Sequence, residues 1–261
     1  MTQMDRDFAA DAATTAFHGT MSQLAAHIPG AYARQAPDGT RSVFTTLPVA
    51  TLNAVYVDYE RDVGVAEAFA KELSAEGLPW SVRFRGEVDE ELMELARGFG
   101  DVSTAALPLL LWDAEVATLP DVVPEGTAVR TVSGEESELM AGVLVAAFGM
   151  PRDIAGALSL PALLDAPNAT GFVLDRQGEA VATGLNVLVG DHVGLFNGAV
   201  SPEHRRNGYY RALVAARLRH AVASGARHAF TQTSPMSRPL YESLGFRPAE
   251  TWTYLIPAQG A

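Results

Sequence analysis

The sequence predicts a mixed α/β protein, and three observations lead to this prediction. Stretches with apolar residues at helical spacing alternate with short stretches rich in β-branched and aromatic residues. Glycine or proline stands at several of the boundaries between them. Residues 119–126, with two prolines and a glycine, read as a linker between two parts that each contain helices and strands. This order is typical of sheets flanked by helices.

The first part, residues 1–118, is expected to form one domain. Its first helix has Phe17, Met21, Leu24 and Ile28 near helical spacing. The second helix is closed by Gly77 and the third by Gly98, since glycine favours the left-handed conformation after a helix. The predicted elements are helix 7–28, strands 41–48 and 52–58, helix 63–76, strand 80–84, helix 87–97 and strand 104–112.

The second part, residues 127–261, is expected to form the other domain. Ser133 and Glu136 have the spacing of a capping box, in which each side chain bonds the other residue's free backbone N–H group. Gln177-Gly178 and Gly190-Asp191 suit tight hairpin turns. The predicted elements are strand 128–132, helix 133–148, helix 153–164, strands 170–175, 180–189 and 193–200, helix 210–223, strand 228–233, a short helix from Ser237 and strand 246–256.

Composition excludes several classes of protein. The chain has 261 residues, a net charge of -12 and no cysteine, so disulfides, thiolate metal sites and a cysteine nucleophile are excluded. Residues 1–124 hold 19 acidic and 8 basic side chains, and an acidic surface repels DNA and anionic membranes. The six histidines form no His-x-x-x-His pair, so no metal is expected. With no signal segment and no apolar run near 20 residues, we expect a cytoplasmic protein without nucleic-acid or membrane partners.

The turn from Val200 to Arg211 predicts an anion site. It joins an apolar strand to a helix whose first N–H groups lack intrahelical partners and carry the positive end of the helix dipole. Gly208 allows a ligand to approach the backbone. No Asp or Glu lies between Glu203 and Glu242, whereas seven arginines do: Arg205, Arg206, Arg211, Arg217, Arg219, Arg227 and Arg238. For Arg217, Arg219 and Arg227, a solvated helix face is an equal alternative.

Two motifs in this region resemble those of the GNAT superfamily of acyl-CoA N-acyltransferases. Arg205-Arg206-Asn207-Gly208-Tyr209-Tyr210 follows the family's Arg/Gln-x-x-Gly-x-Gly/Ala signature, except that Tyr210 replaces a small residue. Leu240-Tyr241-Glu242-Ser243-Leu244-Gly245-Phe246 resembles the Leu-Tyr-x-x-x-Gly-Phe run of the family's last helix. The resemblance is specific over residues 127–256. Residues 8–113 look like the degenerate half of tandem members, so one active site is expected, in the C-terminal half.

The resemblance implies the fold, the co-substrate and the roles of the site residues. It implies two GNAT-like domains with mostly antiparallel central sheets flanked by helices. Acetyl-CoA or another acyl-CoA would be the co-substrate, and the acceptor a primary amine of a small molecule that attacks the thioester directly. Tyr241 would be the general acid for the CoA thiolate, and Asn197 would orient water or substrate. The residues implied in CoA binding are Ala199, Val200, Arg205, Arg206, Asn207, Gly208, Tyr209, Tyr210 and Ser234.

Several points stay open at this stage. Gly198 suits a bulge that separates its strand from the neighbouring strand. His192 and Glu203 are the titratable neighbours in sequence for deprotonating the amine. Alternatives to the enzyme are a non-catalytic acyl-CoA sensor and, more weakly, a dinucleotide-binding oxidoreductase. The acceptor, the acyl chain length, the base and the oligomeric state, with a homodimer as one possibility, are not determined by the sequence.

Overall fold

The chain forms two compact units that exchange segments. The computed structural model describes residues 3–120 and 123–258. Unit 1 comprises the described residues of Met1–Thr20 together with Leu110–Arg247, and unit 2 comprises Met21–Leu109 with the described residues of Pro248–Ala261. These bounds differ from the predicted domains 1–118 and 127–261, because each unit takes one segment from the other part of the chain. Of the predicted linker 119–126, residues 121–122 lie outside the described residues, and the others form no helix or strand.

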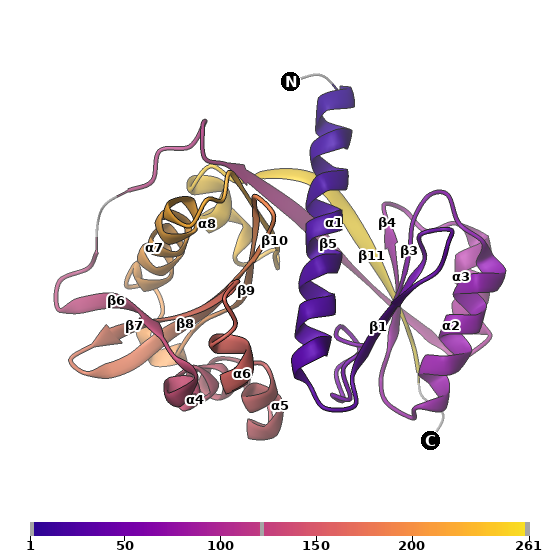
Figure 1. The fold of residues 1–261 in the computed structure, drawn as a ribbon, viewed down its shortest axis with the longest axis horizontal. Coiled ribbons are helices and arrows are strands. Elements are labelled where there is room, and N and C mark those ends of the chain that lie inside the picture. The colour runs from indigo at the N-terminus through magenta and orange to yellow at the C-terminus, as the bar shows by residue number, and fades with distance from the viewer. Residues whose placement is uncertain (1–2, 121–122, 259–261) are drawn as a thin grey trace. The chain divides into compact units, whose positions relative to one another are not determined.

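Unit 2 is built on a mostly antiparallel sheet with the order β1-β2-β3-β4-β11, followed by β5. Strands β3 and β4 are the parallel pair, and helix α2 connects them. The core lies between the sheet and helices α2 and α3, which share one face of it (Figure 1). The elements are β1 (Tyr32–Gln35), β2 (Arg41–Phe44), β3 (Ala54–Val57), α2 (Val63–Ala75), β4 (Ser81–Arg85), α3 (Glu90–Arg97), β5 (Val102–Asp113) and β11 (Arg247–Pro257).

Unit 1 contains the other strands of the same 11-stranded sheet, in the order β6-β7-β8-β9-β10, and β10 is followed by β5. Strands β9 and β10 are parallel and α7 connects them, whereas the pairs from β6 to β9 are antiparallel. Helices α7 and α8 lie on one side of this sheet and α4, α5 and α6 on the other (Figure 1). The strands are β6 (Thr127–Val132), β7 (Ala169–Arg176), β8 (Glu179–Val189), β9 (His192–Val200) and β10 (His228–Gln232).

The helical segments of unit 1 follow local signals in the sequence. The predicted Ser133–Glu136 capping box is present. The predicted helix 153–164 is instead two short helices, because Pro161 has no N–H group to continue the first one and begins the second. The segments are η1 (Gly134–Glu136), α4 (Ser137–Phe148), α5 (Arg152–Ala157), α6 (Pro161–Leu164), η2 (Pro202–His204), α7 (Tyr209–Ala223) and α8 (Arg238–Ser243).

Helix α1 (Gln3–His27) contributes to the core of unit 1 through its first part. The ring of Phe17 lies 6.1 Å from that of Phe196 on β9 and 6.2 Å from that of Phe230 on β10, measured between centroids. The N-terminal segment therefore packs against the same two strands that lead to the predicted site. Among the described residues, no helix has both the length and the hydropathy needed to span a membrane.

Candidate active site

The predicted anion-binding turn lies at the exposed start of α7. Gly208 is the N-cap residue, with a φ of 77°, and no side chain caps the helix. A Cβ at this position would approach only Pro124, at 3.8 Å, so glycine is required by the backbone conformation rather than by crowding. Among the described residues, the backbone N–H groups of residues 206–210 donate no hydrogen bond. The turn thus presents free donors at the positive end of a 15-residue helix.

The equivalent helix of unit 2 differs at this point. Helix α2 also follows a strand and leads to a parallel neighbour, but Asp62 caps it by accepting a hydrogen bond of 2.8 Å from the N–H group of Gly64. A carboxylate at the N-cap occupies the place that an anionic ligand would take. The start of α7 is therefore uncapped by a side chain, whereas that of α2 is capped by a carboxylate.

The two arginines of the turn have different surroundings. Arg205 is exposed and donates to the backbone oxygens of Val200, at 3.3 Å, and Ala147, at 2.9 Å, so it ties the turn to the end of α4. Arg206 is exposed in a left-handed conformation, with a φ of 65°, and within the described chain its guanidinium makes no hydrogen bond or ion pair. Asn207 donates to the carbonyls of His204 and Arg205 and so stabilises the turn itself. Arg206 is therefore the arginine most available to a ligand.

Strand β9 carries the predicted bulge. Thr183 pairs with Ala199 and Leu185 with Phe196, so Gly184 alone faces the two residues Asn197 and Gly198. Asn197 takes a φ of 51°, which is uncommon outside glycine. The extra residue bends β9 away from its straight course.

The same strand separates from β10. Their register pairs His228 with His192, Ala229 with Val193 and Phe230 with Gly194, while β9 continues to Val200. The paired register ends at Gly194, and the Thr231 hydroxyl donates to the Leu195 carbonyl at 3.0 Å. The backbone edge of β9 on the β10 side is thus unpaired along its last residues in the described sheet. This split lies directly before the turn at the start of α7.

Tyr241 lies beside the bulge through its contact with Tyr210. The two hydroxyl oxygens are 2.7 Å apart, and Tyr241 is 4% exposed. A Cβ placed on Gly198 would overlap the Tyr210 hydroxyl, so this hydroxyl lies on the bulge itself. Burial raises the pKa of Tyr210 well above its usual range, and the neighbouring Tyr241 raises it further. Tyr210 therefore stays protonated at neutral pH.

Arg217 on α7 is a third member of this group, and sequence reasoning missed it. It is 0% exposed, so the interpretation as a solvated helix face is wrong. Its Nε donates to Asn186 Oδ1 at 2.9 Å, and one terminal nitrogen donates to the carbonyls of Leu185 and Phe196. The other terminal nitrogen has no partner among the described residues. A signal was present in the sequence, since Arg217 follows Leu213 and Val214 at helical spacing on the buried stripe.

The remaining predicted residues have mixed surroundings. Asn197 donates its side-chain amide to the Leu158 carbonyl at 3.0 Å, which holds the end of α5 against the bulge. The Tyr209 side chain packs into the core of unit 1, so only its backbone faces the turn. Ser234 is exposed, and its hydroxyl lies 3.0 Å from that of Ser237 at the start of α8.

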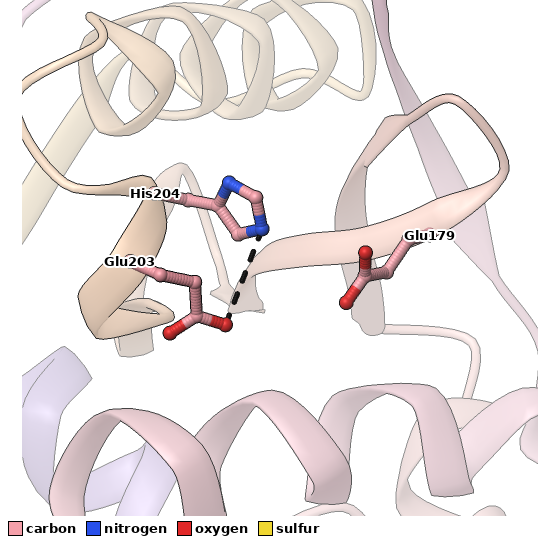
Figure 2. Close-up of side chains that lie close together, drawn as sticks. All are labelled: Glu179, Glu203 and His204. Carbon is pink, nitrogen blue, oxygen red and sulfur yellow. Dashed lines mark ion pairs between the residues drawn. The ribbon is translucent and has the colours of Figure 1, made fainter.

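Neither titratable neighbour named from the sequence lies at the bulge. His192 stands at the other end of β9, five residues and therefore about 17 Å before Asn197. Glu203 is exposed in η2, and with Glu179 and His204 it forms a group whose ligand atoms lie within 4.8 Å of one another (Figure 2). His204 Nε2 and Glu203 Oε1 are 4.0 Å apart. These are carboxylates and an imidazole of the kind that bind metal ions, although sequence spacing had not suggested a site here.

The split sheet, the uncapped helix and the tyrosine pair together give an α/β protein whose free N–H groups at the start of α7 would suit an anionic ligand. Residues 144–246 match the model of the acetyltransferase (GNAT) family. The chain therefore carries a GNAT-family acetyltransferase domain, and the matched residues contain both motifs. Among curated protein sequences, none matches the chain significantly.

Solved structures share the fold across both units. A GCN5-related N-acetyltransferase from Kribbella flavida matches with a TM-score of 0.67 and 21% identity, over 87% of this chain and 90% of that one. A GCN5-related N-acetyltransferase from Sphaerobacter thermophilus matches with a TM-score of 0.60 and 14% identity, over 87% and 81%. A putative GNAT-family acetyltransferase from Novosphingobium aromaticivorans matches with a TM-score of 0.56 and 14% identity, over 88% and 92%. At sequence identities this low, the comparisons show a similarity of fold.

Proposed function

We propose that this protein is an acyl-CoA-dependent N-acyltransferase that transfers acetyl from acetyl-CoA to a primary amine of a small molecule. One observation supports this above all: the separation of β9 from β10 leads directly to the uncapped, exposed start of α7. An extended thioester arm needs an unpaired strand edge, and a pyrophosphate needs free N–H donors. The two features follow each other along the chain in the order that such a ligand requires.

The binding roles follow from the free backbone groups. The N–H groups of residues 206–210 bind the pyrophosphate, and Arg206 adds a cation that no protein carboxylate neutralises in the described chain. The last residues of β9, Ala199 and Val200, are the proposed neighbours of the pantetheine arm, although the Val200 carbonyl accepts from Arg205 and Ala199 pairs with Thr183 of β8. Ser234, exposed before α8, stays a candidate contact to CoA.

Tyr241 acts as the general acid in this proposal. The amine nitrogen attacks the thioester carbonyl carbon, the C–S bond breaks, and the sulfur leaves as a thiolate that takes the Tyr241 proton. Burial keeps Tyr210 protonated, and in this proposal Tyr210 is the donor to the Tyr241 oxygen, which leaves the Tyr241 proton free for the sulfur. The buried Arg217 stabilises the negative charge that then develops on Tyr241. The amine proton passes to solvent, and Tyr241 regains its proton from solvent after CoA leaves.

A calorimetric titration with acetyl-CoA and a free-thiol release assay test the proposal. We expect binding with one site per chain, and thiol release that depends on an added primary amine. Aminoglycosides, polyamines and amino-acid amides together provide acceptors of different size and charge. Failure to bind acetyl-CoA would contradict the proposal.

A non-catalytic acyl-CoA sensor is the second candidate, and one observation favours it. The Tyr210 side chain covers Gly198 at the bulge, and its hydroxyl already engages that of Tyr241. If this pair blocks the approach of the thioester sulfur, CoA binds without turnover. Binding without thiol release for every acceptor in wild type, together with thiol release in Tyr210→Ala, would favour the sensor.

A further inference from the structure

Unit 2 contains a buried arginine with an unusual environment. Arg83 lies in the middle of β4 and is 3% exposed. Its register partners are Tyr56 on β3 and Tyr254 on β11, so the three side chains project from the same face of the sheet. The guanidinium carbon lies 5.0 Å from the Tyr56 ring centroid and 4.5 Å from that of Tyr254. A tyrosine ring thus flanks the cation on each side.

No carboxylate of the described residues bonds to this cation. Within the described residues, Arg83 makes no hydrogen bond or ion pair through its side chain, and its Nε is fully buried without a partner. Arg85, two residues along the same face, is different. Its guanidinium donates to both carboxylate oxygens of Glu250, and one terminal nitrogen lies 3.5 Å from Asp58 Oδ2. The acidic side chains of this face are therefore grouped around Arg85 rather than Arg83.

A buried guanidinium with only ring faces for neighbours is incompletely compensated. Removing a charge from water costs more free energy than two cation–π contacts return, and the buried Nε–H donor is left without an acceptor among the described residues. Buried charges in proteins are usually paired with an opposite charge or hydrogen-bonded. We propose that Arg83 is the centre of a second ligand site, which binds the carboxylate of a small molecule in unit 2.

A carboxylate fits this position better than a phosphate. Its single negative charge matches the single charge of Arg83, whereas a phosphate dianion would leave a buried negative charge. It is planar and accepts two parallel hydrogen bonds from a guanidinium. Because the two tyrosine rings cover the faces of the guanidinium, a ligand would have to bond to its edge. The rings would then contact a flat or apolar portion of that ligand. This site is independent of the acyl-CoA site proposed for unit 1.

The test measures urea unfolding of the full chain while acetate or benzoate replaces chloride at constant ionic strength. For wild type we expect the midpoint to rise with carboxylate concentration, and more with benzoate than with acetate. Arg83→Met should abolish this response and should have a higher midpoint than wild type in chloride alone, because it removes an uncompensated buried charge.

Arg34→Met is the matched control. Arg34 is also in unit 2 and also stacks on a tyrosine ring, at 4.4 Å from Tyr32, but it is exposed and bonded to Glu72 at 2.7 Å. It should keep the wild-type response. As a direct readout, ¹H–¹⁵N spectra of the arginine Nε–H groups should show the Arg83 signal shifting with benzoate. An unresponsive Arg83 signal, or equal responses of wild type and Arg83→Met, would overturn the proposal, and a larger response to inorganic phosphate would reassign the ligand.

Discussion

The hydroxyl pair of Tyr210 and Tyr241 permits a test of a single residue. If Tyr241 protonates the leaving thiolate, Tyr241→Phe should lower turnover about 10²- to 10⁴-fold, with an unchanged dissociation constant for acetyl-CoA. Thiol release and calorimetry measure the two quantities. Tyr209→Phe is the control, since it removes a hydroxyl from the neighbouring core of the same unit. Turnover close to wild type in Tyr241→Phe would show that the acid is another group.

Gly208 permits a second test at the same scale. Gly208→Val should abolish acetyl-CoA binding, because the side chain would project into the open space in front of the free N–H groups. Valine also strains a backbone with positive φ, so a control must carry the same strain. Gly178→Val serves, as Gly178 has a φ of 86° in an exposed hairpin turn with open space around it. Calorimetry should show lost affinity for the first variant only, and equal affinities would contradict the phosphate assignment.

The motif residues were predictable from the sequence, whereas their mutual contacts were not. A turn with Gly208 and arginines between a strand and a helix has a local signature. The bond between Tyr210 and Tyr241 joins residues 31 positions apart, and no local pattern reports it. Arg217 was misjudged because its charge suggests exposure, although its helical spacing places it among buried residues. Burial of a charge depends on the acceptors that other strands supply.

At the start of the paired strands β9 and β10, two histidine side chains lie against each other. The rings of His192 and His228 face each other with centroids 4.8 Å apart, and His192 bonds Asp191 at 2.7 Å. Burial lowers the pKa of His192, the charge of Asp191 partly opposes this, and His228 lowers it further. The unfolded chain therefore takes up this proton near pH 6.5, whereas the folded chain takes it up only at lower pH.

It follows that the free energy of unfolding should fall as the pH drops below about 6.5. His192→Gln should reduce this loss, measured by urea unfolding at pH 7.5 and pH 5.5. His228→Gln should reduce it less, because it removes only the smaller effect of the neighbouring ring. An acid sensitivity that is identical in wild type and His192→Gln would contradict this account.

Most elements, but not their pairing, were predictable. Periodicity located the long helices and the strands of unit 1 to within a few residues. Strand β1 was missed because its sequence, Tyr-Ala-Arg-Gln, is largely exposed and lacks alternation. The strand at 246–256 was predicted as part of the C-terminal domain, yet it pairs with β4, as in Trp252 with Arg85. Strand pairing over such a separation leaves no mark in local composition.

At the scale of the whole molecule, the exchanged segments predict that residues 127–261 will not fold alone. This fragment lacks Phe17, which packs on Phe196 and Phe230, and Trp112, which donates to the Leu244 carbonyl at 3.1 Å. The loss of each buried aromatic side chain lowers the free energy of unfolding by about 1.5–3 kcal/mol. This is a large part of a typical free energy of unfolding of about 5–15 kcal/mol. Near-ultraviolet circular dichroism should show no fixed tertiary structure.

A fragment of residues 110–247 mixed with a peptide of residues 1–20 is the matching control. It contains the segments of unit 1, so the peptide should restore tertiary structure and acetyl-CoA binding. A native spectrum from residues 127–261 alone would refute the segment exchange. Whether unit 2 is a degenerate GNAT half stays a prediction, although its β3–α2–β4 connection has the same parallel form as β9–α7–β10.

The place of β11 in unit 2 has a consequence for biosynthesis. Strands β1 to β4 are made early, but β11, which pairs with β4, begins at Arg247, 162 residues after β4 ends at Arg85 (247 − 85). At about 5–20 residues per second, the edge of β4 waits about 8–32 s for its partner. During translation that bare edge offers a docking place for chaperones, and slow synthesis lengthens the interval in which a nascent chain can aggregate.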